Sequence, residues 1–214
     1  MRSRKVLWGL PLLAYLVFSF WYTNTEGALS PAEIEGFIAQ MKENGRDEAQ
    51  LARLKVFMEA DTGRQFLMLN NIDMNETPPE VEGAEPGESA DQLMNRYMEH
   101  MYPELFKRAS HPIYFGQAVF TAMDVSGIEG AESWDSAALF RYRSRRDMLE
   151  IVSNPAFGER HHFKIAALTK TVAYPLESTL YLSDPRLLLA LILLCVVALI
   201  DIALFGRRRA LGSE

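Results

Sequence analysis

The two longest hydrophobic stretches of the chain lie near its ends, at residues 6–22 and 187–205. A helix needs about 20 residues to cross the hydrocarbon core of a bilayer, so each stretch predicts a transmembrane helix. Basic residues flank each stretch on the side of the nearer terminus. The positive-inside rule therefore places both termini in the cytoplasm and residues 24–184 outside it, in the periplasm if the cell is Gram-negative.

The first stretch has a second interpretation, because a cleaved signal peptide also combines basic residues with an apolar run. An aromatic cluster between positions 18 and 22 and the absence of a small-x-small cleavage site after it favour a retained anchor. In the second stretch, the ionisable side chain of Asp201 suggests contact with a membrane-protein partner. The alternative is that Asp201 reaches water beside Arg207 and Arg208.

Between these stretches the hydrophobic positions change several times from a helical to a strand-like period. Capping boxes at Ser30 and Ser89 and a cap at Ser144 mark helix starts. The expected helices are residues 30–45, 47–60, 89–109 and 144–168, the last one interrupted at Pro155. The expected strands are residues 66–72, 113–123, 135–142 and 169–177.

From residue 66 onward this order is β-α-β-β-α-β, so we predict an α+β fold of the ferredoxin-like type. The two earlier helices form an extension that precedes it. The chain then has five predicted parts: a cytoplasmic tip with a transmembrane helix (1–23), a helical extension (24–63), a ferredoxin-like domain (64–178), a second transmembrane helix (179–206) and a basic cytoplasmic tail (207–214).

The predicted strands are hydrophobic at both sets of alternate positions, hence on both faces of the sheet. One set contains Phe66, Met68, Ile72, Phe115, Val119, Ala137 and Leu139, and the other contains Leu67, Leu69, Tyr114, Phe120, Ala138, Phe140 and Val172. Both helices of a ferredoxin-like domain cover the same face, so the opposite face needs another cover. We predict that the sheet of a second copy supplies it, which gives a homodimer.

Charge and motifs narrow the function further. Residues 24–184 contain 26 acidic and 15 basic side chains, and this negative surface predicts no nucleic-acid partner. Cys195 is the single cysteine and lies in the second hydrophobic stretch, so the region outside the membrane depends on core burial. The chain has no Gly-rich phosphate loop, CxxC or HExxH motif, which argues against most common enzyme classes.

Three segments, residues 51–71, 88–105 and above all 140–175, resemble a domain-of-unknown-function family of the dimeric α/β-barrel superfamily. The resemblance covers most of the region between the hydrophobic stretches and implies a ferredoxin-like dimer. It implies no established reaction. The wider superfamily includes cofactor-independent quinone-forming monooxygenases, heme-degrading oxygenases and small-molecule isomerases, and a shared fold does not choose among them.

The heme-degrading branch uses an Asn on the first strand, a Trp near the third and a His on the second helix. The residues here that are similar in position are Asn70, Trp134 and either His161 or His162, which we take as candidate catalytic residues. Adjacent histidines on a helix point about 100° apart and cannot share one metal ion. We therefore predict no metal and no cofactor, with heme as the alternative.

Candidate ligand-binding residues are Asn71, Tyr114, Arg141 and Arg143. Alternation on a strand would place Arg141 and Arg143 on one face, where two planar guanidinium groups suit a carboxylate. The alternative is that these arginines neutralise nearby acids: Asp135, Asp147 and Glu150. The sequence favours a membrane-anchored binding or assembly module, and the alternative is a cofactor-independent or heme-related monooxygenase or isomerase acting on a small aromatic or acidic substrate.

Overall fold

The computed structural model describes residues 2–206, so the predicted basic tail at 207–214 lies outside the described residues. The described chain divides into two compact units. One unit contains residues up to Thr25 together with those from Ser178 onward, and the other is Glu26–Glu177.

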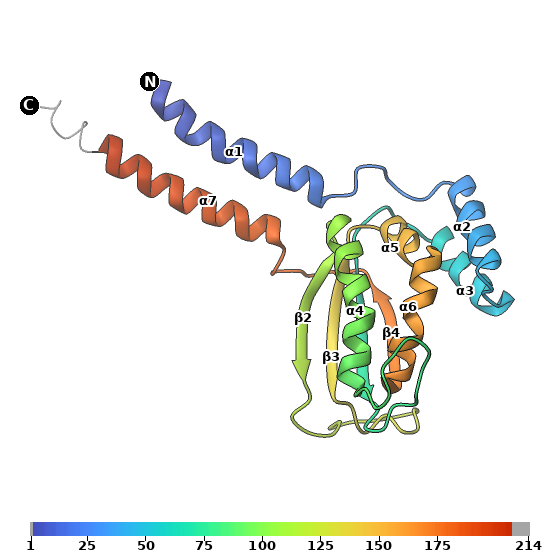
Figure 1. The fold of residues 1–214 in the computed structure, drawn as a ribbon. Helices are drawn as coiled ribbons and strands as arrows, with labels where there is room; N and C mark the ends of the chain where they lie inside the picture. Colours follow the sequence, from blue (N-terminus) through green and yellow to red (C-terminus); the bar gives the residue numbers. More distant parts are fainter. Residues whose placement is uncertain (1, 207–214) are drawn as a thin grey trace, which may run out of the picture. The chain divides into compact units, whose positions relative to one another are not determined.

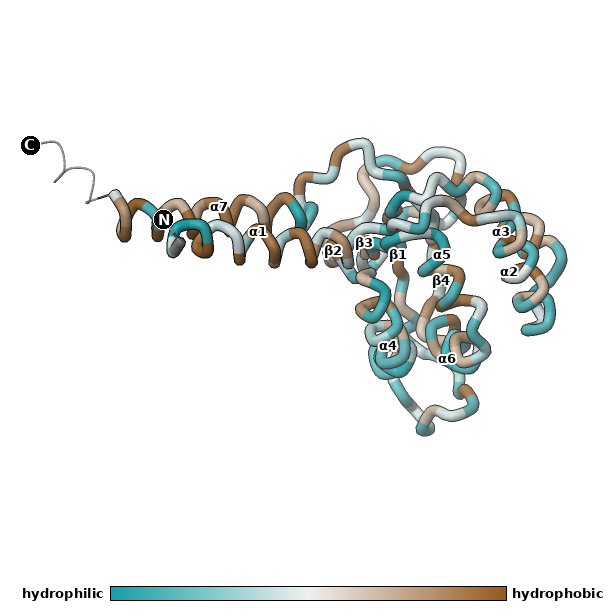
Figure 2. Tube along the Cα trace, turned by 90° about the horizontal axis from the view of Figure 1, so that it is seen from above, coloured by the Kyte–Doolittle hydropathy of each residue, from teal (hydrophilic) through white to brown (hydrophobic). Residues whose placement is uncertain are grey.

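The first unit is a pair of helices, α1 (Arg2–Tyr22) and α7 (Pro185–Asp201), the latter continued by a short π-helical turn, η1 (Ile202–Gly206). They lie side by side and are mostly hydrophobic (Figures 1 and 2). Residues 3–22 and 185–206 are long and apolar enough to cross a membrane, by length and composition. Arg4 donates to both carboxylate oxygens of Asp201, at 2.7 and 2.5 Å, so Asp201 binds a residue of its own chain.

The second unit contains one antiparallel sheet with the order β2-β3-β1-β4. Its strands are β1 (Phe66–Met74), β2 (His111–Gln117), β3 (Ser136–Tyr142) and β4 (Leu168–Leu176). The predicted β-α-β-β-α-β order is confirmed.

The helices of this unit are α2 (Pro31–Glu43), α3 (Glu48–Glu59), α4 (Ala90–Lys107), α5 (Arg145–Val152) and α6 (Pro155–Ala166). The longer connecting helices, α4 and α6, lie on the same face of the sheet (Figures 1 and 2). The opposite face has no helix of this unit over it.

Side-chain caps begin the helices where the sequence predicts. Both capping boxes form: the Ser30 hydroxyl accepts the Glu33 backbone N–H, and the Ser89 hydroxyl accepts that of Gln92. At Pro155 the predicted interruption separates α5 from α6, and the Asn154 side chain caps the second helix. The local chemistry thus sets the element boundaries on the helical side of the unit.

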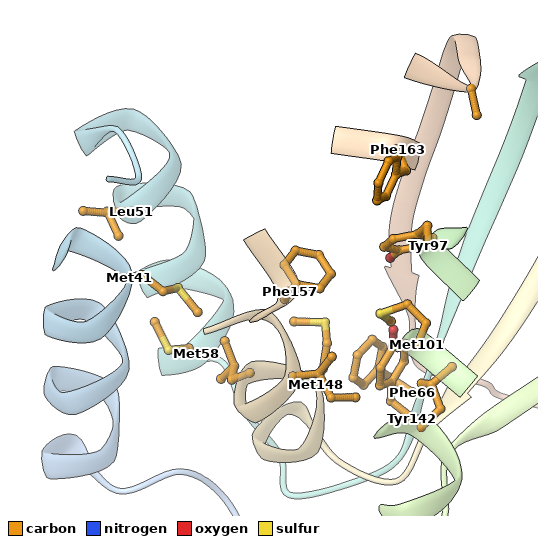
Figure 3. Close-up of a cluster of buried hydrophobic side chains, with 14 of the residues drawn as sticks. Met41, Leu51, Met58, Phe66, Tyr97, Met101, Tyr142, Met148, Phe157 and Phe163 are labelled. Carbon is orange, nitrogen blue, oxygen red and sulfur yellow. The ribbon is translucent and has the colours of Figure 1, made fainter. Parts of the chain in front are cut away.

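The core lies between the helices and the sheet and continues into the α2–α3 hairpin (Figure 3). The rings of Phe66 on β1 and Tyr142 on β3 stack with centroids 5.2 Å apart. Tyr97 of α4 meets Phe157 of α6 edge to face. The buried methionines and leucine of the hairpin extend the same cluster: Met41, Leu51 and Met58. One continuous hydrophobic core therefore holds the extension and the ferredoxin-like part together.

The strand register corrects the predicted division of the two sheet faces. Met68 pairs with Phe140 and Leu69 pairs with Leu139, so Phe140 shares the helix-facing side and Leu139 lies on the other. The prediction had placed the inward and outward residues of β3 the wrong way round. Alternation along a strand fixes its period, whereas only cross-strand pairing fixes its phase relative to the next strand.

The second predicted strand was also too long. β2 ends at Gln117, which pairs with Ser136 at the start of β3, so Val119 and Phe120 lie beyond the strand and are exposed. Past that point the Ala118 N–H donates to the Asp135 carbonyl and the Ala122 N–H to the Glu132 carbonyl, and these separate bonds do not continue the ladder of a strand.

Gly63, between α3 and β1, provides a test of this packing. It has a φ of 71°, and a Cβ there would lie 2.6 Å from the carbonyl carbon of Gly27. Gly87 has a φ of 78° with open space around it. We expect Gly87→Ala to cost about 1 kcal/mol from backbone strain alone and Gly63→Ala to cost at least about 1 kcal/mol more because of the clash.

Thermal unfolding of the full-length protein in detergent would compare the two variants. Equal losses in the two variants would contradict the close packing of the Gly27 loop against Gly63.

Candidate functional site

The face of the sheet opposite the helices is hydrophobic and exposed. β1 contributes Leu67, Leu69 and Asn71 to this face, and the register adds Tyr114, Leu139, Val172, Tyr174 and Leu176 from the other strands. Tyr114, Val172 and Tyr174 are 55%, 45% and 44% exposed. We call these eight residues the open face. Of the candidate ligand-binding residues, Asn71 and Tyr114 belong to it, and the buried Arg141, which pairs with Leu67, lies at one end of the same side of the sheet.

The ring of Tyr114 lies along β2, over Gly116 of the same strand. A Cβ at Gly116 would come within 2.2 Å of the Tyr114 hydroxyl oxygen, so the ring passes over the glycine. The missing side chain at Gly116 therefore leaves the ring room to lie flat. A flat aromatic surface at the β2 edge extends the hydrophobic area of the open face.

Arg141 and Arg143 bind different groups. Arg141 is fully buried at one end of the sheet, and its Nε and Nη2 donate to Gln65 Oε1 at 3.0 and 2.8 Å, while Nη1 donates to the Ala109 carbonyl. Arg143 follows the end of β3 and donates to both oxygens of Asp147, at 3.0 and 2.5 Å. Both guanidinium groups therefore bind groups of the protein itself. For Arg143 the partner is Asp147, one of the nearby acids that the sequence offered as an alternative to a ligand.

The next two arginines bind the helical extension. Arg145 donates to the Phe57 carbonyl of α3 and forms ion pairs with Asp61 and Glu177. Arg146 donates to Glu33 of α2 at 2.6 Å, and Arg146 holds the pKa of that carboxyl down, at about 2. Of the other acids considered, Glu150 pairs with Arg108, and Asp135 accepts the backbone N–H of Met74.

The four candidate catalytic residues have separate partners within the protein. Asn70 lies on the helix-facing side of β1 and donates to the Met68 carbonyl at 3.2 Å. Trp134 lies in the β2–β3 connection, donates to the Ala131 carbonyl at 2.9 Å, and has Lys170 Nζ 4.9 Å from its ring centroid. Asn70 therefore makes its hydrogen bond within β1, and Trp134 makes its hydrogen bond within the β2–β3 connection.

The two histidines of α6 also have different surroundings. The His161 ring stacks on Phe157 with centroids 4.9 Å apart, and burial lowers the pKa of His161 to about 4, with Lys164, Arg46 and His162 adding to the effect. His162 Nε2 lies 3.0 Å from the Glu82 carbonyl oxygen. Within residues 2–206, no group of three His, Cys, Asp or Glu side chains is placed to hold a metal ion.

Two cavities lie beside the α2–α3 hairpin, and Arg46 lines both. The smaller, of about 340 Å³, is formed by Asn44, Arg46, Val152, Asn154, Pro155, Phe157, Gly158, Glu159 and His161. The larger, of about 450 Å³, is formed by Arg46, Gln50, Arg53, Leu54, Phe57, Met68, Met148, Ala173 and Pro175. Sequence reasoning did not single out Arg46 or Arg53. Arg46 precedes the N-cap of α3 and Arg53 lies within the helix, so no helical spacing along the sequence links the two.

Comparison with solved structures shows the fold. RPA0582, a protein of unknown function from Rhodopseudomonas palustris, is 18% identical over 64% of this chain and 96% of its own, with a TM-score of 0.50. The methylated form of RPA0582 is 19% identical over 65% and 96%, with a TM-score of 0.52.

A dimeric ferredoxin-like protein of unknown function from Bacteroides fragilis is 11% identical over 53% and 96%, with a TM-score of 0.33. No family model and no curated protein matches the chain. The likeness to RPA0582 shows a shared fold and carries no activity with it.

The buried position of Arg141 makes a stability test informative. Arg141→Met leaves the Gln65 and Ala109 oxygens without their donors and should cost about 3 kcal/mol, a fall of about 6 to 12 °C in the thermal midpoint. Arg160→Met removes an exposed arginine of α6 and should change stability by less than about 0.5 kcal/mol. An unchanged midpoint for Arg141→Met would instead favour a role in ligand binding.

Proposed function

We propose that this protein is a membrane-anchored, extracytoplasmic binding and assembly module that forms a homodimer through the open face of its sheet. The single observation that carries the proposal is the open face itself. Tyr114, Val172, Tyr174 and Leu176 are exposed on it, and Leu69 and Leu139 are half-buried, although the other face of the same sheet is covered by α4 and α6. Exposed apolar area of this extent marks an interaction surface.

A second copy is the occupant that fits this face best. An isologous dimer brings the same surface of each protomer together, so one apolar face satisfies the other. The central positions of the face are uncharged, and Asp73 and Lys170 lie together at one end, 3.8 Å apart. Two stacked sheets would therefore bury the hydrophobic centre and leave this ion pair at the rim.

Membrane anchoring rests on α1 and α7. Each has the length and hydropathy of a membrane-crossing helix, and the basic residues beside them favour cytoplasmic termini. The Arg4–Asp201 ion pair, at the end of the pair nearer the termini, neutralises the carboxylate that the second helix would otherwise carry alone. Anchored copies meet in two dimensions, which raises their effective concentration and favours dimerisation.

The heme-related alternative requires Asn70, Trp134 and one of the two histidines of α6 to converge on a bound heme. In the described structure these side chains bind separate groups of the protein. Assembly through the open face therefore has the stronger support.

Orientation is testable with a reporter that is active only in an oxidising, extracytoplasmic compartment. Fused after Leu182, it should give signal, because residues 24–184 lie outside the cytoplasm in this proposal. Fused after Glu214, it should be silent. Signal at Glu214 with none at Leu182 would reverse the orientation.

The dimer is testable with one charge placed on the open face. Full-length protein in detergent should have the mass of a dimer at micromolar concentration, and Val172→Asp should give a monomer because a carboxylate would be buried unpaired. Val56→Asp on α3 changes a residue that is 66% exposed and away from the sheet, so it should leave the dimer intact. A monomeric wild type, or a dimeric Val172→Asp, would contradict assembly through the sheet.

A further inference from the structure

The larger cavity beside α3 combines positive charge with a hydrophobic floor. Its basic groups, Arg46 and Arg53, come from the α2–α3 turn and from α3. The rest of the lining comes from α3, α5 and the helix-facing side of β1 and β4, and it is mostly apolar: Leu54, Phe57, Met68, Met148, Ala173 and Pro175. Gln50 adds one amide. No acidic side chain is among these lining residues.

Within residues 2–206, Arg46 and Arg53 have no carboxylate partner, unlike five of the ten arginines between Glu26 and Glu177. Five others each bind a carboxylate: Arg96, Arg108, Arg143, Arg145 and Arg146. Among the described residues, neither Arg46 nor Arg53 has a carboxylate within ion-pair distance, although the surrounding unit is strongly acidic overall. Two unpaired guanidinium groups in one cavity are therefore suited to an anion from outside.

The apolar part of the cavity limits what this anion can be. A small inorganic ion would leave Leu54, Phe57, Met68 and Met148 facing water. A volume of about 450 Å³ lies within the range of small-molecule sites and admits a chain of many carbon atoms. Each buried methylene adds about 0.8 kcal/mol of favourable transfer free energy.

We propose that this cavity binds an amphipathic carboxylate of the fatty-acid type. Arg46 and Arg53 bind the carboxylate, with Gln50 as a further donor, and the hydrocarbon chain lies along the apolar floor toward Met68 and Pro175. The site is complete within one protomer, and it lies on the helix-facing side of the sheet. It names a ligand class for the proposed binding role and does not depend on the dimer.

The test uses the full-length protein in phosphatidylcholine nanodiscs and radiolabelled dodecanoate in equilibrium dialysis. Because lipid also takes up dodecanoate, the decisive comparison is between two double variants with the same charge. Arg46→Gln/Arg53→Gln removes the two cavity arginines, and Arg64→Gln/Arg160→Gln removes two exposed arginines outside the cavity lining.

We expect saturable uptake of one dodecanoate per protomer by the wild type and by the Arg64/Arg160 variant. The Arg46/Arg53 variant should bind at least about tenfold more weakly, with an unchanged thermal midpoint because neither side chain has an ion pair to lose. Dodecanol, which lacks the charge, should bind the wild type at least about tenfold more weakly than dodecanoate. Inorganic phosphate at millimolar concentration should not displace dodecanoate.

Equal uptake by the two double variants would overturn the proposal, and so would displacement by phosphate alone or equal binding of dodecanol. Val172→Asp separates the test of dodecanoate binding from the test of dimerisation, because Val172 belongs to the open face and not to the cavity lining. Normal uptake by that variant is expected whether or not the wild type is dimeric.

Discussion

The turn from β3 into α5 carries four arginines whose bonds hold the second unit together. Arg141 joins the segment before β1 to the end of α4, and Arg143 fixes the first turn of α5 through Asp147. Arg145 reaches α3 and the end of β4, and Arg146 reaches α2. Burying charges is costly unless each charge has partners of good geometry, and here the four arginines within six consecutive positions direct their guanidinium groups to separate elements. The rest of the fold depends on this arrangement.

The cavity is a consequence of the same turn. Arg145 and Arg146 hold the α2–α3 hairpin against the helical side of the domain. The Cζ atom of Arg145 lies over the Phe57 ring, 4.5 Å from the centroid of that ring. β4 is the edge strand on this side, and its outer residues remain exposed. The hairpin therefore encloses a space beside β4 without filling it, and Arg46 and Arg53 line that space. The extension has a structural role and also forms one wall of a site.

The two faces of the sheet have different roles for a simple geometric reason. In the β-α-β-β-α-β order both crossover helices lie on one side, so no helix of the domain covers the second side, and in the proposed function a second copy covers it. The exposed hydrophobic residues there favour association of the monomer with another surface. In the proposed function, membrane anchoring brings copies of the protein together and so favours this association.

The sequence alone determined the local features of this protein. The caps at Ser30, Ser89 and Ser144, the break at Pro155 and the order of strands and helices follow from backbone hydrogen bonding and hydrophobic period, which act over a few residues. The tertiary structure decided which residues of β3 face the helices and where β2 ends. It also decided the partners of Arg141 and Arg143. Only the tertiary structure brings Arg46, Met68 and Pro175 to one cavity. These features depend on contacts between residues distant in the chain, and a pattern along the chain does not specify which distant groups come together.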